Sequence, residues 1–135
     1  MDFSEFTRLT QEANTMLSAG RLKEAETVLY QLIISDISDL DKAALSVKMA
    51  YIHDRLGSIE EALNWYDKGM AYEQIYGRFE ITEKKAEYLS QNGRSKEAIE
   101  IYELLAKQPF ITETDKERIR KMIQALVGKA MREWR

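Results

Sequence analysis

A short block of sequence occurs three times in this 135-residue chain and constrains its fold more than any other feature. In each copy a glycine is followed four residues later by glutamate and five residues later by alanine. Another alanine precedes each glycine by seven residues, and a large apolar residue follows it by nine. The glycines are Gly20, Gly57 and Gly93, which stand 37 and then 36 residues apart. A constant period of this length is typical of repeat proteins, in which each repeat is one supersecondary unit.

The chain is predicted to be all-α, because it has one proline among its 135 residues and is rich in helix formers. Each repeat glycine lies between two stretches with apolar residues at helical spacing. We therefore expect each glycine to end one helix in the left-handed conformation, so that every repeat is an antiparallel helix pair. The expected helices are residues 3–18 and 22–36, 40–55 and 59–75, and 79–91 and 95–107.

Small residues are expected where the two helices of each pair touch, because helices joined by so short a turn cross at about 8–10 Å. The repeated alanines fit this role, and the repeated glutamates fall in the first turn of the second helix, where the helix dipole favours an acid. Ser58 and Glu61 have the spacing of a capping box. The alanine pairs expected in contact are Ala13 with Ala25, Ala50 with Ala62, and Ala86 with Ala98.

A seventh helix is predicted near residues 113–134, after a cap signal that begins at Thr112. Its apolar residues recur every three or four positions from Ile119 to Trp134 and form one stripe. An array of repeats needs such a helix to cover its apolar end, so we interpret this segment as a capping helix. The chain is then a single domain, residues 1–135, with repeats at about 3–37, 40–76 and 79–110.

The composition disfavours an enzyme, a cofactor and a metal site. The chain has no cysteine and one histidine, and it lacks a glycine-rich phosphate loop. The first ten residues include two acids and no apolar run, which argues against a secretory signal, and no apolar run is long enough to span a bilayer. We expect a soluble, cytoplasmic protein without membrane insertion.

Charge is distributed unevenly along the chain. Residues 112–135 contain seven basic and four acidic residues, a net charge of +3, whereas residues 1–111 contain 13 basic and 19 acidic residues, a net charge of −6. Because the basic residues alternate with acids and the body is acidic, we do not expect nucleic-acid binding.

The repeated pattern of small residue, Gly, Ala and Tyr resembles the tetratricopeptide repeat over residues 3 to about 110. The chain departs from that family in lacking the early tryptophan, in having only Pro109 as a closing proline, and in its longer period. The resemblance implies a right-handed α-solenoid of three antiparallel helix pairs plus the capping helix. It also implies that the first helix of each pair lines a concave groove that receives a peptide or helix of a partner protein.

The resemblance places ten residues in that groove by their offset from each glycine. Tyr51 is the central candidate, because tyrosine buries much area at little entropic cost, although it can equally be packing between helices. The family's clamp for a C-terminal carboxylate is not expected, since Thr10, Lys48 and Glu80 replace residues that it requires. The groove candidates are Thr10, Asn14, Leu17, Val47, Lys48, Tyr51, Asp54, Arg55, Lys84 and Glu87.

The sequence favours an adaptor that binds another protein in this groove, and it leaves two alternatives open. One is a scaffold that self-associates through Met122, Met131 and Trp134 of the last helix. The other is a dedicated chaperone of one client. The oligomeric state expected is a monomer or a weak homodimer. For His53, packing between helices is favoured over ligand binding.

Overall fold

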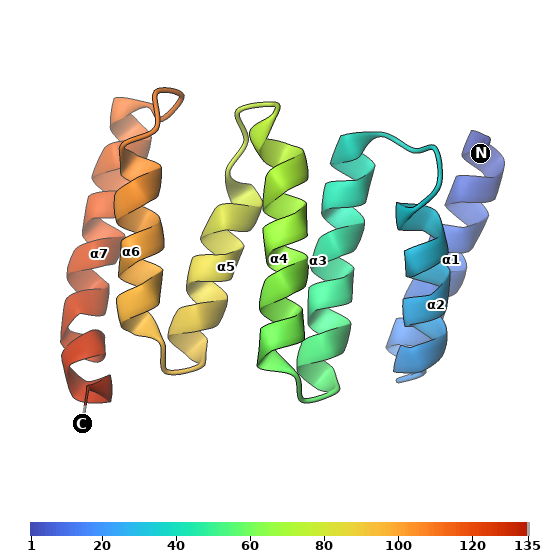
Figure 1. Cartoon of the computed structure of the whole chain (residues 1–135), viewed down its shortest axis with the longest axis horizontal. Coiled ribbons are helices and arrows are strands. Elements are labelled where there is room, and N and C mark those ends of the chain that lie inside the picture. Colours follow the sequence, from blue (N-terminus) through green and yellow to red (C-terminus); the bar gives the residue numbers. More distant parts are fainter. Residues whose placement is uncertain (135) are drawn as a thin grey trace. The chain divides into compact units, whose positions relative to one another are not determined.

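A computed structural model describes residues 1–134 of the chain (Figure 1). These residues form seven α-helices and no strand, which confirms the all-α fold and the number of helices predicted. The helices are α1 (Phe3–Ser18), α2 (Leu22–Ile33), α3 (Asp39–Arg55), α4 (Ile59–Gln74), α5 (Glu80–Gln91), α6 (Ser95–Ala106) and α7 (Glu113–Glu133).

The helices belong to two compact units, Met1–Tyr76 and Gly77–Arg135. Unit 1 contains the hairpins α1–α2 and α3–α4, and α2 also packs against α3. Unit 2 contains the hairpin α5–α6, and α7 packs along α6. Within each unit the closest association is therefore between helices that are adjacent in the chain, as expected of a helical-repeat protein.

The three repeat glycines end α1, α3 and α5 in the left-handed conformation, with φ of 76°, 88° and 76°. At Gly57 the backbone N–H of Ser58 donates to the carbonyl of His53 at 2.9 Å, and that of Gly57 donates to Asp54 at 2.9 Å. This pair of bonds is the Schellman motif, and the same pair recurs after Gly20 and Gly93. The turn predicted from glycine spacing is thus built three times in the same way.

The second helices begin in two different ways. At α4 the Ser58 hydroxyl accepts a hydrogen bond from the Glu61 N–H at 3.2 Å, which is half of the predicted capping box. The other half would need the Ser58 N–H, which is bonded to His53. At α2 and α6 an arginine precedes the helix and pairs with the repeat glutamate, Arg21 with Glu24 and Arg94 with Glu97. These arginines hold the pKa of both carboxyls below the usual range.

All six repeat alanines are buried, none with more than 1% of its surface exposed. The larger fully buried apolar side chains are Leu29, Leu32, Met49 and Ile52 in unit 1 and Leu89, Tyr102 and Ile119 in unit 2. Full burial of residues this small is what a close helix crossing requires, so the steric role assigned to the alanines is supported.

The helix boundaries agree with the sequence to within one residue except at the end of α2, which was predicted at residue 36 and lies at Ile33. There the Ser35 hydroxyl donates to the carbonyl of Leu32 at 2.5 Å, and the Ser38 hydroxyl accepts from the Asp41 N–H at 3.1 Å. Serine side chains that bond to nearby backbone groups compete with helix continuation, so α2 ends before residue 36. Residues 34–38 then connect the two hairpins of unit 1.

Candidate functional site

Eight of the ten groove candidates lie on α1 and α3 of unit 1. Thr10, Asn14 and Leu17 follow one another at spacings of four and three on α1, so they share one side of that helix. On α3, Tyr51 lies four residues after Val47 and three after Lys48, and Asp54 and Arg55 follow Tyr51 by three and four residues, so the other four residues flank Tyr51. We call these eight residues the α1/α3 face.

A hydrogen bond joins the two helices of this face. The Lys48 Nζ donates to the Asn14 Oδ1 at 2.9 Å, across 34 residues of sequence. The bond orients the amide so that its Nδ2–H₂ group is left to donate elsewhere, and the lysine retains its positive charge beside it. Two of the groove candidates, Asn14 and Lys48, are therefore in direct contact within unit 1.

Apolar surface lies close to this polar pair along α3. Tyr51, one turn after Lys48, is 46% exposed, whereas Val47 and Leu17 are half-buried. The Thr10 hydroxyl is buried and, among the described residues, has no hydrogen-bond partner. Asn14, Asp54 and Arg55 are exposed. The face thus combines a partly exposed aromatic ring with exposed amide, carboxylate and guanidinium groups.

The other two candidates, Lys84 and Glu87, are exposed on α5 of unit 2. His53 is half-buried, and its Nε2 lies 4.0 Å from the Glu26 Oε2 of α2. This position of His53 between α2 and α3 fits the packing role that the sequence favoured over ligand binding.

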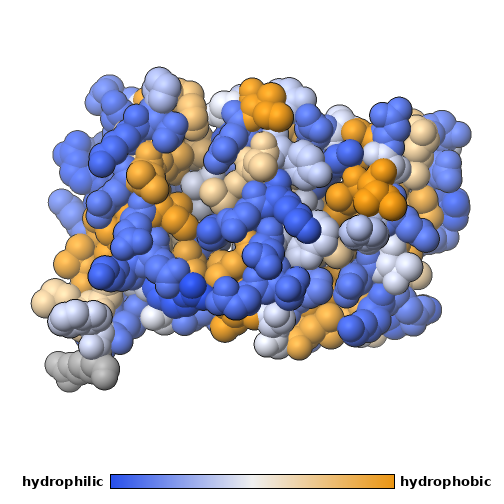
Figure 2. Space-filling model, viewed as in Figure 1, coloured by the Kyte–Doolittle hydropathy of each residue, from blue (hydrophilic) through white to orange (hydrophobic). Residues whose placement is uncertain are grey.

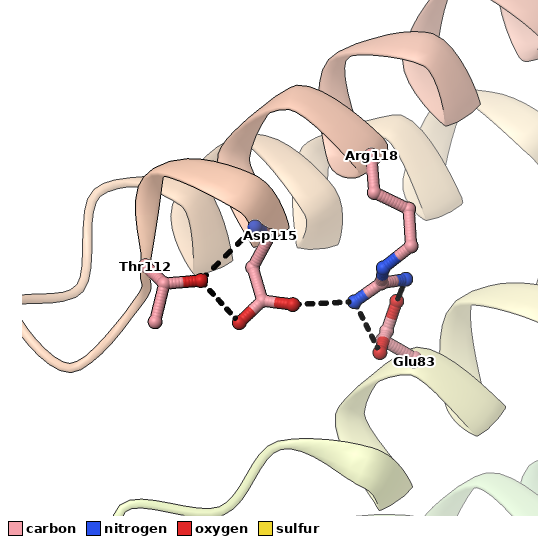
Figure 3. A network of polar contacts seen from close by, with 4 residues as sticks. All are labelled: Glu83, Thr112, Asp115 and Arg118. Atoms are coloured by element: carbon pink, nitrogen blue, oxygen red, sulfur yellow. Dashed lines mark hydrogen bonds and ion pairs between the residues drawn. The ribbon is translucent and has the colours of Figure 1, made fainter.

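An ion-pair network fixes the beginning of α7 within unit 2 (Figure 3). The Arg118 guanidinium donates to both carboxylate oxygens of Glu83 on α5, one at 3.1 Å, and to the Asp115 Oδ1 at 3.4 Å. Asp115 is itself bonded to the Thr112 hydroxyl that caps the helix. The carboxylates raise the pKa of Arg118 above its usual value. Sequence reasoning missed Arg118, although it follows Glu83 by 35 residues, close to the repeat period.

A second polar cluster fixes the end of α7. The Lys129 Nζ donates to the carbonyl and hydroxyl oxygens of Ser90 at 2.6 and 3.0 Å. The Glu133 carboxylate accepts from the Ser95 N–H at 2.9 Å and from the Ser95 hydroxyl at 2.8 Å, and these bonds lower the pKa of Glu133. Glu133 therefore caps the start of α6, where no residue of α6's own N-terminus supplies a side-chain cap.

These two clusters also orient α7. Arg118, near the start of α7, contacts Glu83 near the start of α5. Lys129, near the end of α7, contacts Ser90 near the end of α5, so the two helices run in the same direction. The predicted capping helix thus lies against the last helix pair, in the place that the first helix of another repeat would take.

The three proposed self-association residues are not equivalent. Met122 is half-buried, whereas Met131 and Trp134 are 70% and 85% exposed. Met122 and Met131 are nine residues apart, which places them on opposite sides of a helix. Val127, 44% exposed, lies on the side of Met131 and Trp134.

Within residues 1–134 no three His, Cys, Asp or Glu side chains are grouped to hold a metal ion. None of the helices in that range is both long and apolar enough to cross a membrane. No protein-family model, no curated protein and no solved structure matches this chain.

Proposed function

We propose that the protein is an interaction module that binds a peptide or a helix of another protein on the α1/α3 face. The observation that carries this proposal is the partly exposed Tyr51 one turn from the Asn14–Lys48 pair. An aromatic ring supplies the buried area of a binding hot spot, and the amide and ammonium groups supply hydrogen bonds to a partner's carbonyls and carboxylates. The resemblance to the tetratricopeptide repeat supports the same assignment.

The test is a double variant, Tyr51→Ala with Lys48→Glu, and a matched control. Tyr30→Ala is that control, because Tyr30 is 50% exposed in the same unit but lies on α2, outside the proposed face. Partners captured from a lysate of the source cells by wild type and by both variants are quantified by mass spectrometry. Circular dichroism verifies that each variant is folded.

We expect the specific partner to be lost from the double variant and kept by Tyr30→Ala. Once the partner is purified, loss of a hot-spot tyrosine corresponds to a drop in affinity of about 30-fold. If the double variant and wild type capture the same proteins in the same amounts, the α1/α3 face is not the binding surface.

A further inference from the structure

The C-terminal half of α7 has an apolar row that no described residue of unit 2 covers. Val127, Met131 and Trp134 are 44%, 70% and 85% exposed and follow one another at spacings of four and three, so they lie on one side of the helix. Nearer the start of the same helix, Ile119 is fully buried against unit 2. Isolated apolar side chains on a surface are ordinary, but a row of three large ones along one helix is not.

This row continues into an open hollow between α6 and α7. The hollow has a volume of about 300 Å³, and its apolar floor consists of Ala106, Ile119 and Ile123. Ile123 precedes Val127 by four residues, so the floor and the row follow the same side of α7. We call this floor and row together the α6/α7 groove. Figure 2 shows hydrophobic surface lying among charged side chains over these two helices.

The rim of the hollow is mainly basic. Lys107, Lys116 and Arg120 line it together with one acid, Glu103. Lys116 pairs with Glu113 at 3.4 Å and Arg120 pairs with Glu117 at 2.9 Å, in both cases three residues apart along α7 and exposed to water. Exposed pairs of this kind contribute about 0.2–1 kcal/mol, so the two cations remain open to a competing carboxylate.

The positive charge of the rim favours some binding partners of the groove over others. A second copy of α7 is disfavoured, because α7 has six basic against four acidic residues between Glu113 and Glu133 and would bring cations against cations. An acidic occupant would face opposite charge along the same edge. The hollow lies between two adjacent helices. An amphipathic helix can lay its apolar face into a groove of this kind, because its own apolar residues also recur every three or four positions.

We propose that the α6/α7 groove binds an amphipathic helix of another protein, one that has acidic residues along the edge of its apolar face. The groove lies wholly in unit 2 and uses none of the α1/α3 residues, so it would be a second binding surface. Its test is independent of the function proposed above.

The probe is a synthetic stapled helix about 18 residues long, roughly 27 Å, with leucines on one face and glutamates beside them. A matched peptide has lysine in place of each glutamate, and neither contains tryptophan. The chain has two tryptophans, and Trp65 is buried, so a Trp65→Phe background leaves the exposed Trp134 as the fluorescent reporter. We expect the acidic peptide to shift this emission to the blue, saturably, and to bind roughly tenfold more tightly than the basic peptide at low salt.

Two variants of the full chain complete the experiment. Met131→Glu should weaken binding of the acidic peptide roughly tenfold, whereas Ile75→Glu, at a 72% exposed apolar residue of unit 1, should leave it unchanged. Lys107→Glu combined with Arg120→Glu should reverse the preference towards the basic peptide.

Three outcomes would overturn the proposal. The first is equal affinity for the two peptides, which would indicate unspecific apolar contact. The second is an unchanged emission maximum on adding the acidic peptide. The third is a dimer in sedimentation of the chain alone that Met131→Glu abolishes, because the groove would then be occupied by a second copy.

Discussion

Two glycines in unit 2 are expected to respond to alanine in opposite ways, although both substitutions add the same methyl group. Gly93 has φ of +76°, and a Cβ added there would meet nothing within 4 Å. Any loss of stability must therefore come from the backbone. A left-handed residue with a side chain costs about 1–2 kcal/mol. The lower entropy of the unfolded chain returns about 0.4–1 kcal/mol, so Gly93→Ala should lower the free energy of unfolding by about 1 kcal/mol.

Gly128 stands 35 residues after Gly93, yet it lies inside α7 rather than at a turn. A Cβ there would come within 3.5 Å of one atom of Arg132, an ordinary contact with a flexible side chain. Because alanine is favoured over glycine inside a helix by about 1 kcal/mol, Gly128→Ala should raise the free energy of unfolding. The two variants should then differ by about 2 kcal/mol, or up to about 30-fold in the folding equilibrium.

Urea denaturation followed by far-ultraviolet circular dichroism measures both changes, and hydrogen exchange of unit 2 shows that they arise there. Gly93→Asn serves as a control, because asparagine tolerates the left-handed conformation and should cost less than alanine. A stabilising Gly93→Ala, or a destabilising Gly128→Ala with an unchanged m-value, would refute the assignment of one glycine to a turn and the other to a helix.

Two further predictions concern packing and pH. The folded-state pKa of Glu133 is lowered chiefly by the Ser95 N–H, so its contribution to stability should be complete above the pKa of glutamate in the unfolded chain and should disappear as pH falls through the lowered value. Glu133→Gln should therefore show a smaller loss of stability on acidification than wild type in pH-dependent urea titrations, and equal slopes would contradict this. Ala62→Leu, at a fully buried helix crossing, should cost about 1–3 kcal/mol, whereas Ala71→Leu on the exposed side of α4 should be close to neutral in thermal unfolding.

The repeated block could be interpreted from sequence alone because it depends on local chemistry. Glycine at a fixed offset from apolar periodicity predicts a left-handed helix end, and all three such ends are present at Gly20, Gly57 and Gly93. The buried alanines follow for the same reason, since only a small side chain fits beside so short a turn. The one boundary that was wrong, at the end of α2, depends on serine side chains that compete with the helix for backbone groups.

The candidate sites were less predictable, because exposure depends on which neighbours cover a residue. The apolar stripe of α7 is uniform in sequence, yet the fold buries Ile119 and leaves Met131 and Trp134 in solvent. The ion pairs of Arg118 with Glu83 and the capping of Ser95 by Glu133 join residues 35 and 38 positions apart. No local rule distinguishes them from the other charges on the same helices.

The sequence by itself determined the all-α class, the three hairpins and their turns, since each of these is decided within about ten residues of chain by backbone preference and periodicity. Only the tertiary structure decided which side of α7 is covered, which charges are paired, and that Lys48 reaches Asn14 across 34 residues. Those features arise from the packing of helices that are distant in sequence. Which side of a helix becomes buried depends on the shapes of the neighbouring helices, and a local residue pattern does not encode those shapes.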